Sequence, residues 1–165
     1  MMRWWLVALT AWFLVGCGQS AFIGFTGSST YVDALPHTQR TELTDRFESK
    51  ALLSATYLNA THPDEPAYRE HESFFVGLYI HNDFKGEKAG IHNPLFELTL
   101  NGAEYLSATE VDRQDPLLKL MPLVNRWSRY YIVQFPTQAG LRLQMQLNDL
   151  DTNRSAELVF LKAAP

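Results

Sequence analysis

The chain has 165 residues, of which 46% are hydrophobic, and a formal net charge of −4. This length suits one domain with a substantial core, and the mild acidity without a basic cluster argues against nucleic acid as a partner. With one cysteine, no disulfide can form within the chain, so packing must stabilise the fold.

The first sixteen residues have the parts of a secretory signal. Arg3 supplies a short positive region, and residues 4–15 are apolar except for Thr10. Twelve residues are too few for a membrane-spanning helix, which needs about 20. The small Gly16 then suits the position before a cleavage point. We therefore expect residues 1–16 to be removed as a signal peptide.

The run Leu14-Val15-Gly16-Cys17 ends this segment with the only cysteine of the chain. It resembles the lipobox of bacterial lipoproteins, in which a Leu-like residue, a small or aliphatic residue and Gly or Ala precede the lipid-bearing cysteine. The resemblance implies cleavage before Cys17 and a diacylglyceryl group on its sulfur, often with a third acyl chain on the new N-terminus. The alternatives are an ordinary signal peptide followed by a free thiol, which is a liability in an oxidising compartment, and a signal anchor that is never cut.

The same resemblance implies a protein of the bacterial cell envelope, held on a membrane by the lipid on Cys17. Two or three acyl chains hold a protein almost permanently, because each buried CH₂ contributes about 0.8 kcal/mol. The resemblance also implies that Asp after the cysteine favours the inner membrane. Position 18 is Gly, which favours the outer membrane, on its periplasmic or surface face.

Beyond the cysteine, the sequence predicts a tether and then one domain. Residues 17–34 are mainly small and polar, which is typical of a flexible tether. Residues 35–165 are expected to form the folded domain. Residues 38–49 are predicted as its short N-terminal helix, because Leu43 and Phe47 are four positions apart and would share one helical face.

Seven strands with turn signals between them are predicted after this helix. The predicted strands are 50–58, 73–81, 95–101, 104–108, 129–135, 141–147 and 155–162. Asn101-Gly102 predicts a type I′ hairpin, and the Leu-rich segment 109–127 predicts a turn or short helix that crosses between sheets. The pattern favours a mainly β fold, an antiparallel two-sheet β-sandwich similar in architecture to immunoglobulin-like or fibronectin-type domains.

No motif for catalysis, a cofactor or a metal is present, so the chain is predicted not to be an enzyme. It has no G-x-S-x-G elbow and no Gly-rich phosphate loop. The histidines and acids of residues 59–72 fit a solvated loop rather than a metal site. The run Asp149–Asn153 resembles the opening of a calcium loop, but Arg154 stands where Gly is required and Phe160 where Glu is required. A polar turn fits it better.

Trp127 and Tyr130 are the candidate binding residues, because Trp and Tyr are enriched at interaction hot spots. The alternative is that Trp127, which is the only Trp after the signal, is buried in the core of the sandwich. Alternation along 129–135 places Tyr131 in the core and Tyr130 on the wetter face with Gln134. If the extension continues backwards, Trp127 aligns with Tyr131. We therefore expect Trp127 to be mostly buried and Tyr130 to be partly exposed.

The expected function is binding, as an assembly or scaffold component with an envelope protein as its partner. The alternative is a module that binds a glycan or small molecule, with Trp127 as a stacking platform. A hydrolase with an unrecognised site is a third hypothesis. The predicted sandwich does not decide among them, because such folds host many functions.

Overall fold

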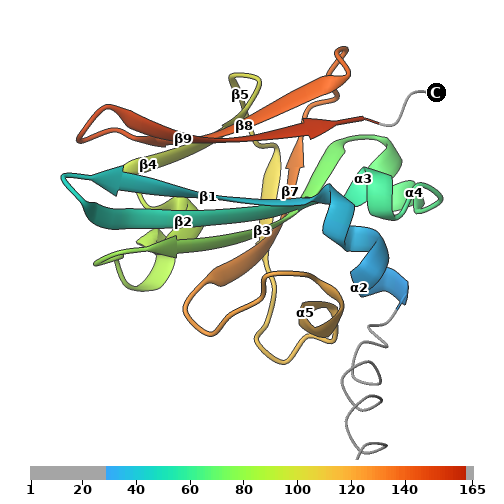
Figure 1. The fold of residues 1–165 in the computed structure, drawn as a ribbon, viewed down its shortest axis with the longest axis horizontal. Coiled ribbons are helices and arrows are strands. Elements are labelled where there is room, and N and C mark those ends of the chain that lie inside the picture. The colour runs from blue at the N-terminus through green and yellow to red at the C-terminus, as the bar shows by residue number, and fades with distance from the viewer. Residues whose placement is uncertain (1–28, 163–165) are drawn as a thin grey trace, which may run out of the picture.

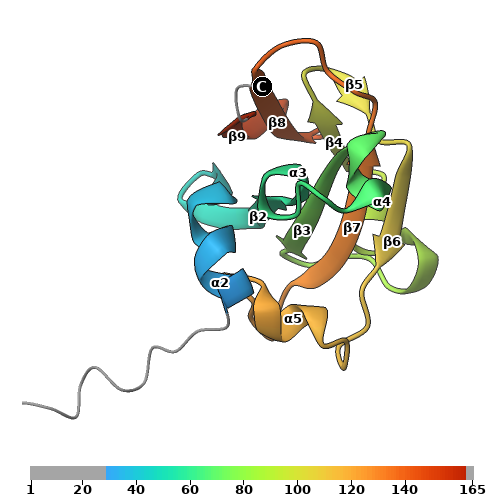
Figure 2. The same ribbon diagram turned by 90° about the vertical axis from the view of Figure 1, so that its right-hand side faces the viewer.

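A computed structural model describes residues 29–162 of the chain and shows two antiparallel sheets packed face to face (Figures 1 and 2). The larger sheet contains β1 (Thr38–Asp45), β2 (Glu48–Tyr57), β3 (Glu72–Ile80), β6 (Ser107–Glu110) and β7 (Arg129–Phe135). The smaller sheet contains β4 (Phe96–Leu100), β5 (Ala103–Glu104), β8 (Arg142–Asp149) and β9 (Arg154–Leu161). The short helices are α2 (Ser29–Ala34), α3 (Leu58–Thr61), α4 (Pro66–Arg69) and α5 (Leu117–Leu120), with 3-10 turns at Leu35–His37, Gly86–Lys88 and Gly90–His92.

The strand order is that of an immunoglobulin-like sandwich, which confirms the predicted fold class. The sheets have the orders β1-β2-β3-β7-β6 and β5-β4-β8-β9. In constant-type immunoglobulin domains, strands A, B, E and D form one sheet and C, F and G the other. Here β2, β3, β7 and β6 take the places of A, B, E and D, while β4, β8 and β9 take those of C, F and G. β1 is an additional edge strand, and β5 lies beside β4.

The core between the sheets follows the predicted alternation along the strands. Phe74, Val76 and Leu78 of β3 are buried in it, and Leu78 is 2% exposed, as the sequence predicts. From the other sheet, Leu143 and Met145 of β8 complete this layer. Successive side chains of a strand point to opposite faces, so every second residue points inward. The local sequence pattern alone therefore identifies these core residues.

A second apolar cluster covers the outer face of the larger sheet. Its buried members are Leu58, Phe75, Val111, Met121 and Tyr130. The segment from β6 to β7, with α5 in it, lies over this face, below the larger sheet in Figure 1. β3 is therefore buried on both faces, and β7 is buried on its outer face at Tyr130, although only one face of each strand meets the other sheet.

The helix predicted over residues 38–49 is wrong, because these residues form β1, a two-residue turn and the start of β2. β1 is an edge strand in which only Leu43 is fully buried, so it lacks the alternation that identifies a strand. The Gln39 amide hydrogen-bonds both backbone groups of Val159 in β9, with the Val159 nitrogen 3.1 Å from Gln39 Oε1. This contact covers part of the β9 edge, which would otherwise be free to pair with another chain.

The predicted hairpin at Asn101-Gly102 is present, with positive φ angles of 49° and 79° at its two residues. Its return strand is not the single strand predicted at 104–108. The chain forms two residues of β5 and then changes sheets to become β6. This split, together with β1, raises the strands of residues 29–162 to nine, against the seven predicted.

The segment 109–127 contains the predicted short helix, α5, but does not cross between sheets. It joins β6 to β7, which pair with each other in the larger sheet. The predicted crossing is therefore wrong. The change of sheet comes one connection earlier, between β5 and β6.

Most of the N-terminal predictions lie outside the described residues, including the signal peptide, Cys17 and residues 17–28 of the tether. The last six residues of the predicted tether form α2, in which Ala34 is completely buried. Within residues 29–162, no helix has the length and apolar character to cross a membrane.

Candidate functional site

The residues that connect α5 to β7, 121–128, form an exposed apolar loop, here called the Trp127 loop. Trp127 is 64% exposed, so the prediction that it is buried is wrong. Leu123 and Val124 are also exposed on this loop. The guanidinium carbon of Arg126 lies 4.0 Å from the centre of the Trp127 ring and covers one of its faces. Trp, exposed aliphatic residues and Arg together are typical of interaction surfaces.

Tyr130 lies beneath this loop and is 1% exposed, so the prediction of partial exposure is also wrong. Its ring stacks on Phe75, with centroids 5.3 Å apart and an interplanar angle of 8°. Tyr131 is buried in the core, as predicted. Alternation along β7 correctly placed the two tyrosines on opposite faces. It did not reveal that the segment from Val111 to Ser128 covers the outer face.

Asn125 and Tyr130 hold the Trp127 loop in one conformation. Asn125 Oδ1 accepts hydrogen bonds from the backbone nitrogens of Trp127 at 2.8 Å and Ser128 at 2.9 Å. The Tyr130 hydroxyl accepts one from the Asn125 nitrogen at 2.6 Å and donates to the Asn125 carbonyl at 3.2 Å. Arg113 donates to the carbonyls of Asn125 at 3.3 Å and Ser128 at 2.6 Å. Because the loop is already ordered, binding through Trp127 costs little additional entropy.

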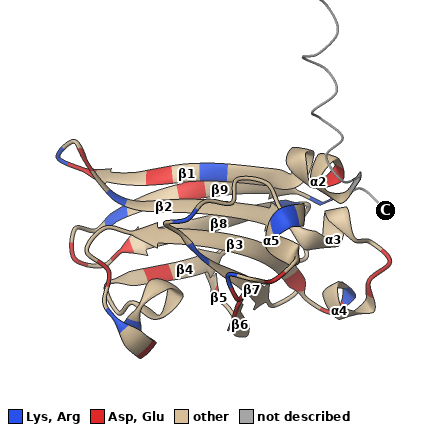
Figure 3. Ribbon diagram, turned by 90° about the horizontal axis from the view of Figure 1, so that it is seen from below, with Lys and Arg blue, Asp and Glu red and all other residues tan. Residues whose placement is uncertain are grey.

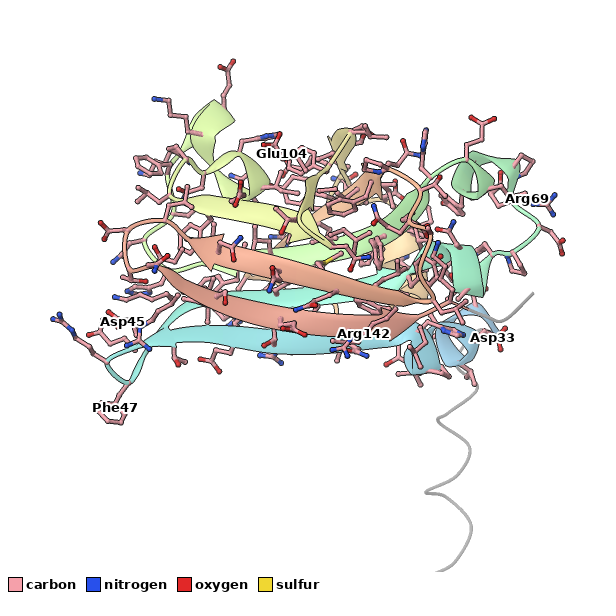
Figure 4. All side chains as sticks on the ribbon, turned by 90° about the horizontal axis from the view of Figure 1, so that it is seen from above. Asp33, Asp45, Phe47, Arg69, Glu104 and Arg142 are labelled. Carbon is pink, nitrogen blue, oxygen red and sulfur yellow. The ribbon has the colours of Figure 1, made fainter. Side chains whose placement is uncertain are left out.

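The turn between β1 and β2 exposes a second aromatic side chain. Phe47 is completely exposed at the hairpin tip and projects away from the domain (Figure 4). Arg46 and Phe47 have φ angles of 47° and 70°, the left-handed conformation that a type I′ hairpin turn requires at both of its central residues. Asn-Gly suits this conformation, as at Asn101-Gly102, whereas residues such as Arg and Phe cost roughly 1–2 kcal/mol each there. Phe47 therefore destabilises its turn and buries no surface in return.

Beside this turn lies a charged cleft of about 720 Å³. Its lining includes three acids, Asp45, Asp149 and Asp151, and three basic residues, Arg46, Lys50 and Arg154. Arg154 Nε and Asp45 Oδ1 are 3.0 Å apart and join β9 to β1. Among residues 29–162, no three His, Cys, Asp or Glu side chains are grouped to hold a metal ion.

Two further apolar side chains lie exposed around this cleft. Leu95 lines it, and the Leu150 nitrogen donates to the Leu95 carbonyl at 2.9 Å. Asp149 accepts hydrogen bonds from the backbone nitrogens of Asp151 and Thr152, so this run is a turn, as predicted. We refer to Phe47, Leu95, Leu150 and the cleft together as the Phe47 end.

A buried acid and a partly buried base lie at the other end of the sandwich. Glu72 is 2% exposed, accepts a hydrogen bond from the Tyr57 hydroxyl at 2.7 Å and pairs with the Lys162 ammonium. Burial and the adjacent Glu72 raise the pKa of Tyr57 well above its usual range, so this phenol stays protonated near neutral pH. The group ties β2 and β3 to the residue that follows β9. The sequence pattern does not reveal this group, because Glu72 falls in the segment 59–72 that is expected to be a solvated loop.

Comparison of the chain with protein-family models, with curated proteins and with solved structures finds no significant match.

Proposed function

We propose that this protein is a lipid-anchored component of the bacterial cell envelope that binds a protein partner through the Phe47 end. The anchor is a lipid on Cys17, after removal of residues 1–16, and the outer membrane is its site. The support for the anchor is the apolar run that ends at the only cysteine of the chain. The partner belongs to the same envelope, in which the protein acts as an assembly component.

The observation that carries the binding proposal is Phe47 itself. A bulky, completely exposed side chain at positive φ costs stability and contributes nothing to the core. Such conformations persist where a function requires them. Aromatic and Arg side chains dominate binding energy at protein interfaces, and the Arg46-Phe47 pair supplies both. The charged cleft beside it matches the polar rim that surrounds an apolar anchor.

The position of Phe47 in the fold supports the same role. The β1–β2 turn, the loop before β4 and the β8–β9 turn meet at one end of the sandwich, while α2 lies at the other (Figure 1). The β3–β4 and β8–β9 connections correspond to loops that carry the binding site in antibody variable domains, which is an analogy of fold only. This end points away from the place where the anchored chain enters the domain.

Site-specific photo-crosslinking in cells tests the partner. Benzoylphenylalanine at Leu150, beside the Phe47 turn, is expected to crosslink one envelope protein, identified by mass spectrometry. Phe47→Gly in the same chain should abolish this product, because it removes the proposed anchor of the interface. The matched control is Leu141, at the other end of β8, which is 56% exposed against 59% for Leu150. Equal crosslinking from both positions, or persistence after Phe47→Gly, contradicts the proposal.

The anchor is tested separately, with labelled palmitate. Cys17→Ala is expected to yield protein that takes up no label, because the thioether to lipid cannot form. Equal labelling of the variant and the natural chain rules out the lipid on Cys17. The crosslinking result does not depend on this outcome.

A further inference from the structure

The chain enters the domain beside α5, the helix that leads into the Trp127 loop. The described residues begin at Ser29, the start of α2, and α2 lies next to α5 in three perpendicular views (Figures 1, 2 and 3). The Trp127 loop follows α5 directly, on the same lower side of the domain in Figure 1. A chain anchored upstream of Ser29 therefore holds this side of the domain toward its anchor.

The length of chain before α2 limits how far that side can stand from a membrane. Eleven residues separate Cys17 from Ser29. Even fully extended, this stretch spans only about 40 Å. The side of the domain that carries α2 and α5 is thus kept within reach of the bilayer, and the local concentration of lipid that it meets is high.

The chemistry of the loop suits a membrane surface. Leu123, Val124 and Trp127 are exposed, and Val32 of α2 adds a fourth apolar side chain, 52% exposed. Trp is enriched where membrane meets water, because its amphipathic ring suits the headgroup region. A loop with three such side chains can insert them below the headgroups while its own backbone bonds, made by Asn125, remain intact.

The charges around the loop favour anionic headgroups. The segment 117–128 contains no Asp or Glu, and it carries Lys119 on α5 and Arg126 beside Trp127. Each basic residue near an anionic leaflet contributes about 1 kcal/mol. Two exposed acids precede this segment, Asp112 and Asp115, and each accepts a backbone N–H two residues along the chain. The charge of the loop therefore differs in sign from that of the acidic protein as a whole.

From this geometry we propose that the Trp127 loop docks on the surface of the membrane that holds the anchor. The inference rests on the proposed lipid at Cys17. The occupant of the apolar loop is an anionic lipid surface, which Trp127, Leu123 and Val124 enter while Lys119 and Arg126 meet the headgroups. Docking orients the domain, so that the Phe47 end stays free for its partner.

The test uses the full lipidated protein in vesicles of phosphatidylethanolamine and phosphatidylglycerol. Replacing Trp4, Trp5 and Trp12 by Phe leaves Trp127 as the only Trp, whether or not the signal is removed. Lipids brominated near the headgroup should quench Trp127 strongly, and iodide quenching should fall several-fold relative to protein in detergent. A matched reporter, Trp127→Phe with Phe47→Trp, places the Trp at the other exposed site and should show neither change.

The outcomes separate the docking from the anchor. Flotation of the protein with vesicles that is lost in Cys17→Ala reports the lipid on Cys17. If the protein floats but brominated lipids leave Trp127 unquenched, the docking is wrong and the anchor stands. Equal quenching of the two reporters also overturns the proposal, because the domain then has no preferred face. Loss of the Trp127 effect in Lys119→Gln/Arg126→Gln, with flotation unchanged, supports the role of the two basic residues.

Discussion

Trp127 and Phe47 are both exposed aromatic residues near turns, but the surrounding structure supports them in opposite ways. Trp127 lies on a loop held by the Asn125 side chain, the Tyr130 hydroxyl and the Arg113 guanidinium. Phe47 lies on a two-residue turn at a φ angle of 70°, where its own Cβ is unfavourable. Exposure alone does not distinguish them. Hydrogen bonds of the fold maintain the conformation around Trp127, whereas the conformation of Phe47 lowers the stability of the domain.

This difference separates stability from binding at the two surfaces. Substitutions beneath Trp127 should weaken both the fold and the interaction, because the same hydrogen bonds serve both. Substitution of Phe47 should weaken only the interaction and should improve the fold. Changes in stability that have opposite signs at the two sites are easier to interpret than a loss of binding alone.

The largest expected effect comes from removing the support of the Trp127 loop. Tyr130→Ala should destabilise the domain by about 3–5 kcal/mol, because it deletes a buried ring stacked on Phe75. Tyr130→Phe keeps the ring and loses only the two hydroxyl hydrogen bonds, so it should cost about 1–2 kcal/mol. Urea unfolding measures both. A loss under 1 kcal/mol for Tyr130→Ala would show that the ring is not buried.

A smaller effect is expected when the loop loses its hydrogen-bonding side chain. Asn125→Ala should cost about 1–3 kcal/mol, since it removes the acceptor for the nitrogens of Trp127 and Ser128. The fluorescence anisotropy of Trp127 should fall at the same time, because the loop becomes mobile while the ring stays exposed. Unchanged anisotropy would indicate that Arg113 and Tyr130 suffice to order the loop.

The sequence predicts the sandwich but neither support nor strain at these two sites, and the reason is physical. Alternation is a local property, so it identifies the inner face of β3 and the outer position of Tyr130. Whether the outer face meets water depends on where residues 111–128 fold, which no local pattern determines. The β1–β2 turn consists of Arg46-Phe47, which lacks the Asn-Gly pattern that predicts a hairpin. The four-residue spacing of Leu43 and Phe47 instead matches that of a helix.

Residues at turns and strand ends differ in how much their local sequence reveals. Asn101-Gly102 was predicted correctly, because its residues match the backbone that the turn requires. The buried Glu72 was missed for the opposite reason. An acid at the start of a strand carries no sign that Tyr57 and Lys162, distant in sequence, will surround it.

The smallest expected change, and the one with the most informative sign, is Phe47→Gly. Gly adopts positive φ without strain, and the Phe side chain is completely exposed, so the variant should gain about 1 kcal/mol of stability. The converse control is Gly102→Ala. Gly102 has a φ of 79° and open space around it, so this variant should lose about the same amount through strain alone. Thermal unfolding of both variants tests this pair of predictions, because the two substitutions should shift Tm by roughly 4 °C in opposite directions.

If Phe47→Gly instead lowers Tm, the Phe side chain stabilises the fold, and its exposure then no longer points to a partner. If Tm rises while the Leu150 crosslink disappears, the chain carries Phe47 at the expense of its own stability, as a binding residue does.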